Sequence, residues 1–440
     1  MNTKALRQKI LDLAIHGKLV PQDPNDEPAS VLLERIKAEK ERLIKEGKIK
    51  RTKRSKAACD KPHYPYELPK GWCWCKLEEI VKITNGRSQK DVEDKEGLYP
   101  IYGSGGIIGK ATEFLCEAGT TIIGRKGTIN NPIFVEERFW NIDTAFGMKP
   151  QYAISDKYFF FFCQHFNFSK LDKSTAVPSL TQSAINDIFI PIPPTNEQKR
   201  IVKEIIRCFS VVEILEKEKI DLQLTIEQTK SKILDLAIHG KLVPQNPTDE
   251  PASELLKRIN PKAEITCDNP HYRNLPKGWA VCRLEDIVEI FDNLRKPINS
   301  NERNSRIANK HKDELYPYYG ATGQVGLIDA YLIDGTYLLL GEDGAPFLDK
   351  SAVKAYPIEG RCWVNNHAHI LRPLCDFDYL MFYLNQVDYK DYVNGSTRLK
   401  LTQSDMRSIL VLLPPIAEQK HISAKVRALF DLLDSIVYHL

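Results

Sequence analysis

The segment KILDLAIHGKLVPQ occupies residues 9–22 and recurs without a change at residues 232–245. Extended to Ile36 and Ile259, the two copies agree at 24 of 28 positions. The chain has 440 residues, which is ordinarily enough for two or three domains. A long, near-identical repeat in such a chain predicts a duplicated structural unit.

Three further blocks match between the two copies and follow in the same order. They contain LPKGW (68–72 and 275–279), the LYP–YG segments (98–103 and 315–320), and the TQS, PP and EQK motifs (181–199 and 402–420). Between these blocks the copies barely resemble each other. We therefore expect one scaffold that carries two different binding surfaces.

The register of the repeat relates the two chain ends. Leu440 aligns with position 219 and Met1 with position 224, so only residues 220–223 are unmatched. One copy of the helical unit is thus continuous in mid-chain, whereas the other is split between the two ends. This arrangement predicts a closed, pseudo-twofold body with the termini side by side.

The mid-chain unit is predicted to be one long helix. Residues 196–239 contain neither Pro nor Gly, and Gly240 provides a stop. Thr195 and Gln198 have the spacing of a capping box. Apolar residues at steps of three and four between positions 205 and 236 predict a coiled-coil seam. We expect this helix to pair antiparallel with both terminal segments.

The predicted fold class is α+β: two mixed α/β domains separated by two long antiparallel coiled-coil helices in a circularly arranged pseudo-twofold repeat. Apolar runs bounded by Gly, Pro and Asn predict strands at 120–124, 188–192 and 337–341. The predicted segments are a conserved helical segment (1–36), a basic linker (37–60), a first domain (61–194), the central helix and following segment (195–259), a second domain (260–415) and a C-terminal helix pairing with the central one (416–440).

Composition indicates a soluble, cytoplasmic protein without a membrane partner. No apolar run approaches 18 residues, the start lacks a signal-peptide core, and no C-x-x-C pair is present among ten cysteines. The net charge is only +4, but residues 37–56 carry ten Lys or Arg against three Glu, and a second basic stretch spans 294–312. Such runs are equally typical of a solvated surface, so charge permits nucleic acid without establishing it.

Several segments resemble enzyme motifs, but each lacks a feature that the motif requires. GSGGIIGK (103–110) has one residue too many between its glycines for a phosphate loop, and Ala111 stands where Ser or Thr would hold magnesium. NPIF (131–134) lacks the second proline of the motif that grips the target base in adenine methyltransferases. His367 and His369 are favoured as hydrogen-bonded structural histidines over metal ligands. We expect a structural turn at 103–110, no catalytic residue and no metal site.

Polar loops opposite the repeated scaffold are better candidates for function. They combine Arg and Lys with Asn, Gln, Ser and Thr, the groups that hydrogen-bond phosphates and base edges. A polar turn without function remains the alternative for each loop singly, but their matching places in both copies favour a role. The predicted DNA-binding residues are Arg87, Lys90, Ser104, Arg125, Lys126, Asn130, Asn131, Lys173, Thr175, Thr181 and Gln182 in the first domain, and Arg295, Lys296, Arg303, Arg306, Thr322, Gln324, Ser396, Thr397, Arg398, Lys400 and Gln403 in the second.

Taken together, these motifs resemble the specificity subunits of type I restriction-modification systems. The resemblance covers nearly the whole chain. It rests on the split LDLAIHGKLVPQ repeat, the LPxGW motif at the start of each domain, the TQS, PP and EQK motifs at its end, and the dissimilar sequences between them. It implies two target-recognition domains, each reading one half of a bipartite, asymmetric double-stranded DNA site, and helices that hold them apart. It also implies two methyltransferase (modification) subunits and restriction/translocase subunits as partners.

On this resemblance the chain is not an enzyme and binds no cofactor, because S-adenosylmethionine, ATP and Mg²⁺ belong to the partner subunits. One departure is the basic insert: 24 residues separate Ile36 from Lys61, against nine between Ile259 and Asn269. The alternative is a non-enzymatic coiled-coil scaffold joining two different ligand- or protein-binding domains. A self-contained DNA methyltransferase is disfavoured by the missing cofactor loop.

Overall fold

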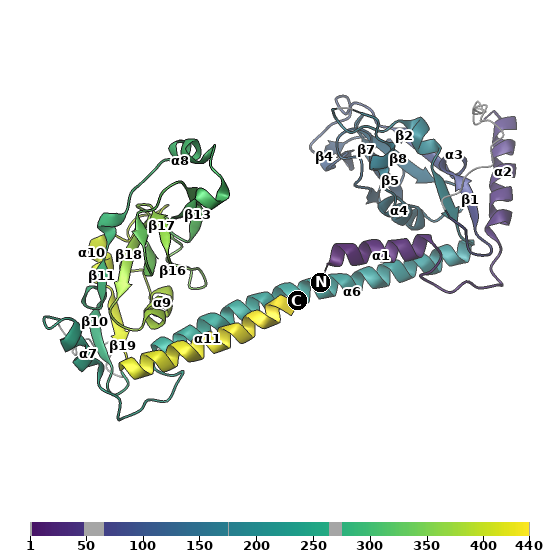
Figure 1. The fold of residues 1–440 in the computed structure, drawn as a ribbon. Coiled ribbons are helices and arrows are strands. Elements are labelled where there is room, and N and C mark those ends of the chain that lie inside the picture. Colours follow the sequence, from purple (N-terminus) through teal and green to yellow (C-terminus); the bar gives the residue numbers. More distant parts are fainter. Residues whose placement is uncertain (1, 48–65, 175, 264–274, 440) are drawn as a thin grey trace. The chain divides into compact units, whose positions relative to one another are not determined.

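The computed structural model describes residues 2–47, 66–174, 176–263 and 275–439. The chain divides into two compact units, Met1–Glu218 and Lys219–Leu440. Helix α6 (Thr195–Ile238) supplies its first part to unit 1 and the rest to unit 2 (Figure 1). The predicted bounds of the segments stay predictions, as does the expected closed body with the two termini side by side.

Unit 1 contains a four-stranded antiparallel sheet, a three-stranded sheet and a two-stranded one. Their strand orders are β2-β8-β5-β6 (Val81–Asn85, Ala145–Pro150, Thr120–Gly124, Ile133–Val135), β4-β3-β7 (Gly106–Ala111, Tyr99–Gly103, Trp140–Asn141) and β1-β9 (Cys73–Lys76, Phe189–Ile192). The helices are α1 (Thr3–Ile15), α2 (Ala29–Lys45), α3 (Leu77–Ile80), α4 (Asp156–His165), the 3-10 helix η1 (Phe168–Leu171) and α5 (Gln182–Asn186).

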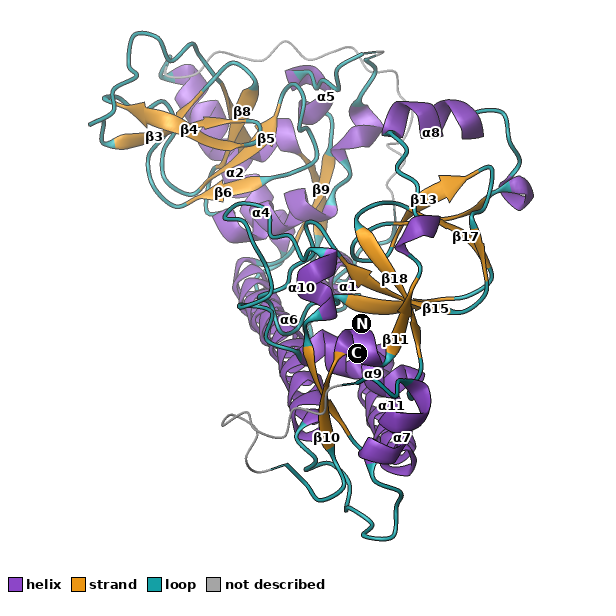
Figure 2. Cartoon of the chain, turned by 90° about the vertical axis from the view of Figure 1, so that its left-hand side faces the viewer, coloured by secondary structure: helices purple, strands orange, loops and turns teal. Residues whose placement is uncertain are grey.

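Unit 2 repeats this plan, with one more strand in its second sheet. Its sheets have the orders β11-β18-β15-β16 (Val288–Ile290, Ala368–Pro373, Tyr337–Gly341, Ala355–Ile358), β13-β12-β17-β14 (Gln324–Ile328, Tyr316–Tyr319, Arg361–Val364, Ile333–Asp334) and β10-β19 (Ala280–Arg283, Leu410–Leu413). Its helices are α7 (Ala252–Ile259), α8 (Ser300–Ile307), α9 (Phe377–Gln386), α10 (Gln403–Arg407), α11 (Ile416–His439) and the 3-10 helices η3 (Leu284–Asp286), η4 (Asp292–Leu294) and η5 (Lys312–Glu314). Figure 2 distinguishes these strands from the helices.

The sequence-predicted strands are confirmed as β5, β9 and β15. The segment 103–110 joins β3 to β4 in an antiparallel hairpin, which confirms the predicted turn. The fold class is likewise confirmed, with mixed sheets and helices in both units beside one long helix.

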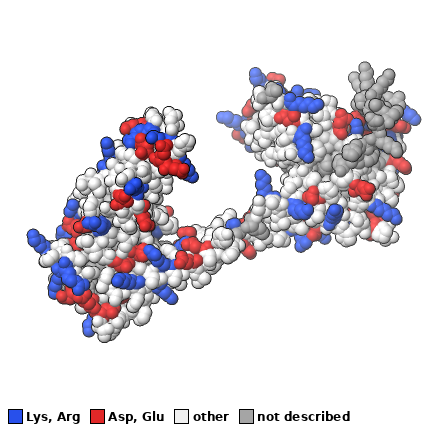
Figure 3. All heavy atoms as spheres, in the orientation of Figure 1, with Lys and Arg blue, Asp and Glu red and all other residues white. Residues whose placement is uncertain are grey.

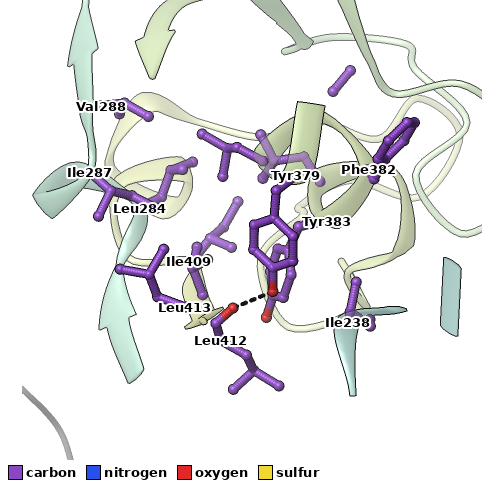
Figure 4. Close-up of a cluster of buried hydrophobic side chains, with 14 of the residues drawn as sticks. Ile238, Leu284, Ile287, Val288, Tyr379, Phe382, Tyr383, Ile409, Leu412 and Leu413 are labelled. Atoms are coloured by element: carbon purple, nitrogen blue, oxygen red, sulfur yellow. Dashed lines mark hydrogen bonds between the residues drawn. The ribbon is translucent and has the colours of Figure 1, made fainter. Parts of the chain in front are cut away.

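In each unit a buried tyrosine ties a domain helix to the last strand of the domain. In unit 1 the Tyr158 hydroxyl of α4 donates to the Pro191 carbonyl at 2.7 Å. In unit 2 the Tyr379 hydroxyl of α9 donates to the Leu412 carbonyl at 2.5 Å, inside the apolar cluster of Figure 4. Both rings are fully buried, so each pairs its one polar atom as an apolar core requires.

The start of α6 departs from the prediction. Gln198 is buried, and its side chain accepts from the Ser155 N–H at 2.9 Å and donates to the Pro193 carbonyl at 3.0 Å. The expected capping box with Thr195 is therefore wrong, because a buried amide must satisfy its own hydrogen bonds and finds them in the domain. In unit 2 Gln419 does the same with the Asp376 N–H at 2.9 Å.

Three repeated motifs meet at the Glu197 carboxylate. Trp72 of LPKGW donates its indole N–H to Glu197 Oε2 at 3.1 Å, and Gln22 of LVPQ donates to Oε1 at 3.3 Å. Gly17, with φ of 65°, lies against this junction, since a Cβ there would sit 2.4 Å from Pro69 Cγ. Burial raises the pKa of Glu197.

The second copy repeats this junction in detail. Trp279 donates to Glu418 Oε2 at 3.0 Å, and Gln245 donates to Oε1 at 3.2 Å. Burial again raises the pKa of Glu418. The separated motifs of the repeat are thus parts of one hydrogen-bonded joint between the helical unit and the domain.

The terminal helices pair antiparallel with α6 inside each unit. Arg7 of α1 forms an ion pair with Glu216 at 2.8 Å, and Lys230 of α6 forms one with Asp434 of α11 at 2.6 Å. The predicted seam is buried where the domains lie, as at Ile205 and Ile226, and becomes exposed between those positions, as at Leu215 (38 % exposed) and Leu222 (37 %).

In the described part of the chain, no helix combines the length and apolarity that a membrane crossing requires. The eight cysteines within it are free thiols.

Candidate nucleic-acid interface

In unit 1 the candidate face is centred on residues 124–127 (Gly-Arg-Lys-Gly), which leave the buried strand β5. The Arg125 N–H donates to the Thr144 carbonyl at 2.7 Å, and its guanidinium lies 5.7 Å from the centroid of the Phe146 ring. Among the residues that the structure describes, neither Arg125 nor Lys126 forms an ion pair with a carboxylate. Their charge is therefore not neutralised by any carboxylate among the described residues.

Two other predicted segments lie beside this loop. Lys126 pairs with Ser179 in an isolated β-bridge, which brings in the segment before the TQS motif. A Cβ placed on Gly124 would lie 3.1 Å from Ser104 Cβ, so the β3–β4 turn is adjacent as well. The structure thus assembles three polar segments from separate parts of the sequence.

The glutamine of each TQS motif bonds to a residue at the end of the first strand of the four-stranded sheet, β2, or just after its counterpart β11. Gln182 Oε1 accepts from Asn85 Nδ2 at 3.3 Å, and in unit 2 Gln403 Nε2 donates to Asp292 Oδ2 at 2.8 Å. Thr181 caps α5 by accepting from the Ala184 N–H at 3.2 Å. These predicted residues border the loops but already have internal partners.

The remaining predictions in unit 1 divide between exposed and internally bonded groups. Arg87, Lys90, Asn131 and Lys173 are exposed. Asn130 Oδ1 accepts from the backbone N–H of Phe168 at 2.8 Å, which gives this side chain a structural role. Thr175 lies outside the described residues. All of these stay predictions as DNA contacts.

In unit 2 the same place on the scaffold has the opposite charge. Residues 341–344 (Gly-Glu-Asp-Gly) follow β15, and Asp343 pairs with Lys400 in an isolated β-bridge, as Lys126 does with Ser179. Arg398 Nε lies 2.6 Å from Asp343 Oδ1, and Lys400 Nζ lies 3.4 Å from Glu342 Oε1. The predicted cations of this loop are therefore balanced by two carboxylates.

Arg295 is part of an internal network. Its guanidinium lies 3.1 Å from Asp292 Oδ2 and contacts Glu342, and its side chain is 16 % exposed. His369, fully buried, bonds Asp292 Oδ2 at 2.7 Å and the Leu401 carbonyl at 3.0 Å. Burial opposes ionisation of Asp292, but the hydrogen bond and charge of His369 lower its pKa overall. His369 is the hydrogen-bonded structural histidine that the sequence favoured.

His367 differs from that expectation. It lines an open hollow of about 700 Å³, together with Asp343, Arg398, Thr322 and Thr397. Within the described part, its buried Nδ1 has no hydrogen-bond partner and lies 3.4 Å from Asp343 Oδ2. The hollow therefore brings three predicted residues together with two that sequence reasoning did not select.

Of the other predicted residues in unit 2, Arg303 and Arg306 lie on α8. Arg303 stacks 4.9 Å from the centroid of the Tyr318 ring, while Arg306 pairs with Asp329 at 2.6 Å. Lys296, Gln324 and Ser396 are exposed. Figure 3 shows acidic and basic side chains intermixed on the visible face of unit 2.

Glu342 and Asp343 were not predicted, because the prediction rested on cationic, amide and hydroxyl side chains. Aligning GRKG (124–127) with GEDG (341–344) would have identified them, since both follow a predicted buried strand. Glycines with φ of 80° and 79° close the two loops, at Gly127 and Gly344.

Comparison with known proteins identifies the family of this doubled scaffold. Residues 69–224 and 276–436 each match the type I restriction modification DNA specificity domain. The chain belongs to this family. The match to two such domains agrees with the specificity-subunit resemblance and does not favour the scaffold alternative.

Two specificity subunits from Escherichia coli are similar to the chain. The type I restriction enzyme EcoAI specificity subunit is 30% identical over 373 residues, covering 66% of this chain and 63% of its own length. The EcoEI specificity subunit is 28% identical over 398 residues, covering 68% and 64%. The chain therefore spans less than two thirds of the length of either relative.

One solved chain, from work on complex assembly and conformational transition of the type I R-M system, supports the fold. It has a TM-score of 0.52 at 16% identity and covers 85% of this chain and 94% of its own length.

Proposed function

We propose that this chain is the sequence-specific DNA-binding subunit of a type I restriction-modification complex, acting in the cytoplasm. Each unit binds one half of a bipartite, asymmetric site in double-stranded DNA, and partner subunits methylate or cleave. The observation that carries the proposal is the pair of loops at 124–127 and 341–344, which occupy equivalent places but carry opposite charges.

Opposite charges at one scaffold position suit the reading of different bases. Arg recognises guanine O6 and N7, whereas a carboxylate accepts from the cytosine N4 amino group. Arg125 and Lys126 in unit 1 suit guanine or phosphate, and Asp343 in unit 2 suits cytosine. Arg398, which pairs with Asp343 at 2.6 Å, offsets the repulsion between that carboxylate and the DNA backbone.

The duplicated surface supports two identical methyltransferase partners, one per copy. Lys18 and Lys241 are exposed in their units, as are Pro24 and Pro247, and each pair is identical between the two copies of the repeat. Core packing does not require identity at exposed positions, so contact with the same kind of partner surface is the better explanation. Restriction/translocase subunits complete the complex.

The chain supplies recognition without catalysis in this proposal. S-adenosylmethionine, ATP and Mg²⁺ bind to the partner subunits. The segment that most resembles a phosphate loop, 103–110, forms a β-hairpin and leads into no helix, so it lacks the helix N-terminus that binds phosphate in such loops.

Mapping of methylated bases in cells that carry the chain and its methyltransferase tests this function. The expected result is one bipartite motif, with two defined halves around an unread spacer, that disappears when the gene for this chain is deleted. Methylation unchanged by the deletion would contradict the proposal. Binding of S-adenosylmethionine by the purified chain alone would contradict the absence of catalysis.

A further inference from the structure

A cluster of metal-ligating side chains lies in unit 1, where α1 packs against α4. Asp12 and His16 project from α1 and its C-terminal end, and His165 is the last residue of α4. One potential ligand atom from each residue lies within 4.8 Å of the other two. His165 Nε2 is 3.4 Å from Asp12 Oδ1.

We propose that Asp12, His16 and His165 bind one divalent transition-metal ion, with Zn²⁺ the best match, and that this ion fastens α1 to α4. Two imidazoles and one carboxylate form a common Zn²⁺ ligand set, and a water molecule completes the tetrahedron. Ca²⁺ and Mg²⁺ prefer oxygen ligands and do not suit a site with two nitrogen donors.

The hydrogen bonds around the cluster support this donor set. His16 Nδ1 lies 2.7 Å from the Asp12 backbone carbonyl, which can only accept, and 3.3 Å from Asp12 Oδ1, so Nδ1 carries a proton and Nε2 is the nitrogen left to bind an ion. A metal-bound histidine usually donates its other N–H in this way.

The Asp12 carboxylate is suited to provide the negative charge. Its Oδ1 lies 3.3 Å from His16 Nδ1 and 3.4 Å from His165 Nε2, so it faces both imidazoles. Lys9 Nζ is 3.5 Å from Asp12 Oδ2 and competes with a metal for this group. The Lys9 side chain is 66 % exposed, so it can turn away into solvent when the ion binds.

Ion binding requires a small local contraction. Ligand atoms at about 2.0–2.1 Å from Zn²⁺ in a tetrahedron lie about 3.3 Å apart, so the present separations of up to 4.8 Å must shorten. His165 ends its helix, where rotation of one side chain disturbs little packing. Tyr66 stacks on His16 with ring centroids 4.1 Å apart and covers one side of the site.

The second copy provides an internal comparison. Asp235 and His239 repeat the i,i+4 pair, and His239 Nδ1 again lies 2.7 Å from the Asp235 carbonyl oxygen. At the position equivalent to His165 the chain has Gln386, whose Nε2 donates to the Lys350 carbonyl at 3.3 Å. The third ligand is therefore missing, and we expect one ion per chain, in unit 1.

Such an ion would fix a contact between a repeated element and a variable one. α1 belongs to the near-identical repeat, whereas α4 belongs to the first domain, and these helices pack against each other. The site departs from the expectation of no metal. The signal was the Asp-x-x-x-His pair inside the repeat itself, which places both side chains on one helical face.

Titration of the full-length, tag-free chain with Zn²⁺ in a calorimeter tests the site. The expected result is one ion per chain, with a rise in the thermal midpoint of unfolding that Mg²⁺ does not produce. His165→Gln installs the residue found in the second copy and should weaken binding on the order of a hundredfold or more, since even outer-shell changes cost 10–100-fold. Gln386→His should add a second ion.

Co²⁺ provides an independent readout. Its visible absorption should indicate tetrahedral nitrogen and oxygen ligands and lack the thiolate charge-transfer bands that binding to the chain's cysteines would produce. Equal Zn²⁺ affinity of the wild type and His165→Gln, with both variants folded by circular dichroism, would overturn the proposal. Thiolate bands retained in His165→Gln would also overturn it.

Discussion

Trp72 donates its indole N–H to the carboxylate of Glu197 across 3.1 Å, and both side chains are buried. The two residues come from motifs 125 positions apart, LPKGW and EQK. Their counterparts in the second copy, Trp279 and Glu418, form the same bond at 3.0 Å. The repeated motifs therefore specify a joint between helix and domain, while the sequence between them is left free to vary.

Removal of the indole donor should destabilise unit 1. Trp72→Phe keeps an aromatic ring but leaves one oxygen of the buried Glu197 without its partner, which should cost about 1–3 kcal/mol of unfolding free energy. Chemical denaturation followed by circular dichroism measures this. Trp279→Phe should affect the transition of unit 2 by a similar amount. A loss from Trp72→Phe no larger than that from an exposed change such as Glu254→Gln would refute the importance of the joint.

The same joint predicts a pH dependence. Burial raises the pKa of Glu197 and Glu418 above 4.5, so each folded carboxyl holds its proton more tightly than the unfolded one. Unfolding free energy should therefore decrease as pH rises through the interval between 4.5 and the raised value. The double variant Glu197→Gln, Glu418→Gln should lose this component of the slope. Curves of unfolding free energy against pH that run parallel for the variant and the wild type between pH 4 and 7 would argue against this effect of the two glutamates.

Unit 1 should contribute cationic contacts to DNA. If the guanidinium reads a base, Arg125→Ala should weaken binding by about 1–3 kcal/mol for one DNA sequence. If it contacts phosphate, the substitution should reduce the slope of log binding constant against log salt concentration by about 1 for all sequences. Fluorescence anisotropy over a salt series separates the two outcomes. Arg138, which pairs with Glu117 at 2.9 Å, provides the control substitution Arg138→Ala, and equal effects of both changes would count against the loop.

Helix α6 should set the spacer between the half-sites. Four residues inserted at 220–223 lengthen a helix by about 6 Å and nearly keep its face, which corresponds to about two base pairs at roughly 3.4 Å each. The methylated motif in cells with the insertion should have a spacer longer by one or two base pairs and unchanged halves. Two inserted residues should instead destabilise the protein, because they rotate the seam away from its partner. A four-residue insertion mutant that still methylates the motif with its original spacer would disprove that α6 sets the distance between the half-sites.

The repeat, the long helix and several strands could be predicted because each depends on local or periodic sequence signals. The seam residues Ile205 and Ile226 are buried as their spacing indicated. The Glu197 joint could not be predicted, since it needs three distant motifs to converge in space. Gln198 shows the limit of local reasoning: its spacing fits a capping box, but tertiary partners determine its bonds.

The candidate site was predicted only in part, for a similar reason. Arg125 and Lys126 lack carboxylate partners in the described part of the chain and stay predicted DNA contacts. Arg295 carries the same charge, but Asp292 and Glu342 engage it inside unit 2. Sequence composition reports the charge of a side chain and not whether the folded domain has already neutralised it.

The most direct test exchanges the charges of one loop. The double substitution Arg125→Glu, Lys126→Asp gives unit 1 the acidic pair found at 342–343, and the methylated motif is then mapped in cells that contain the partner subunits. The account predicts that one half of the bipartite motif changes or is lost from the recognised sequence, while the other half and the spacer are unchanged. A variant that methylates a motif altered in both halves would contradict the independent reading of half-sites by the two units.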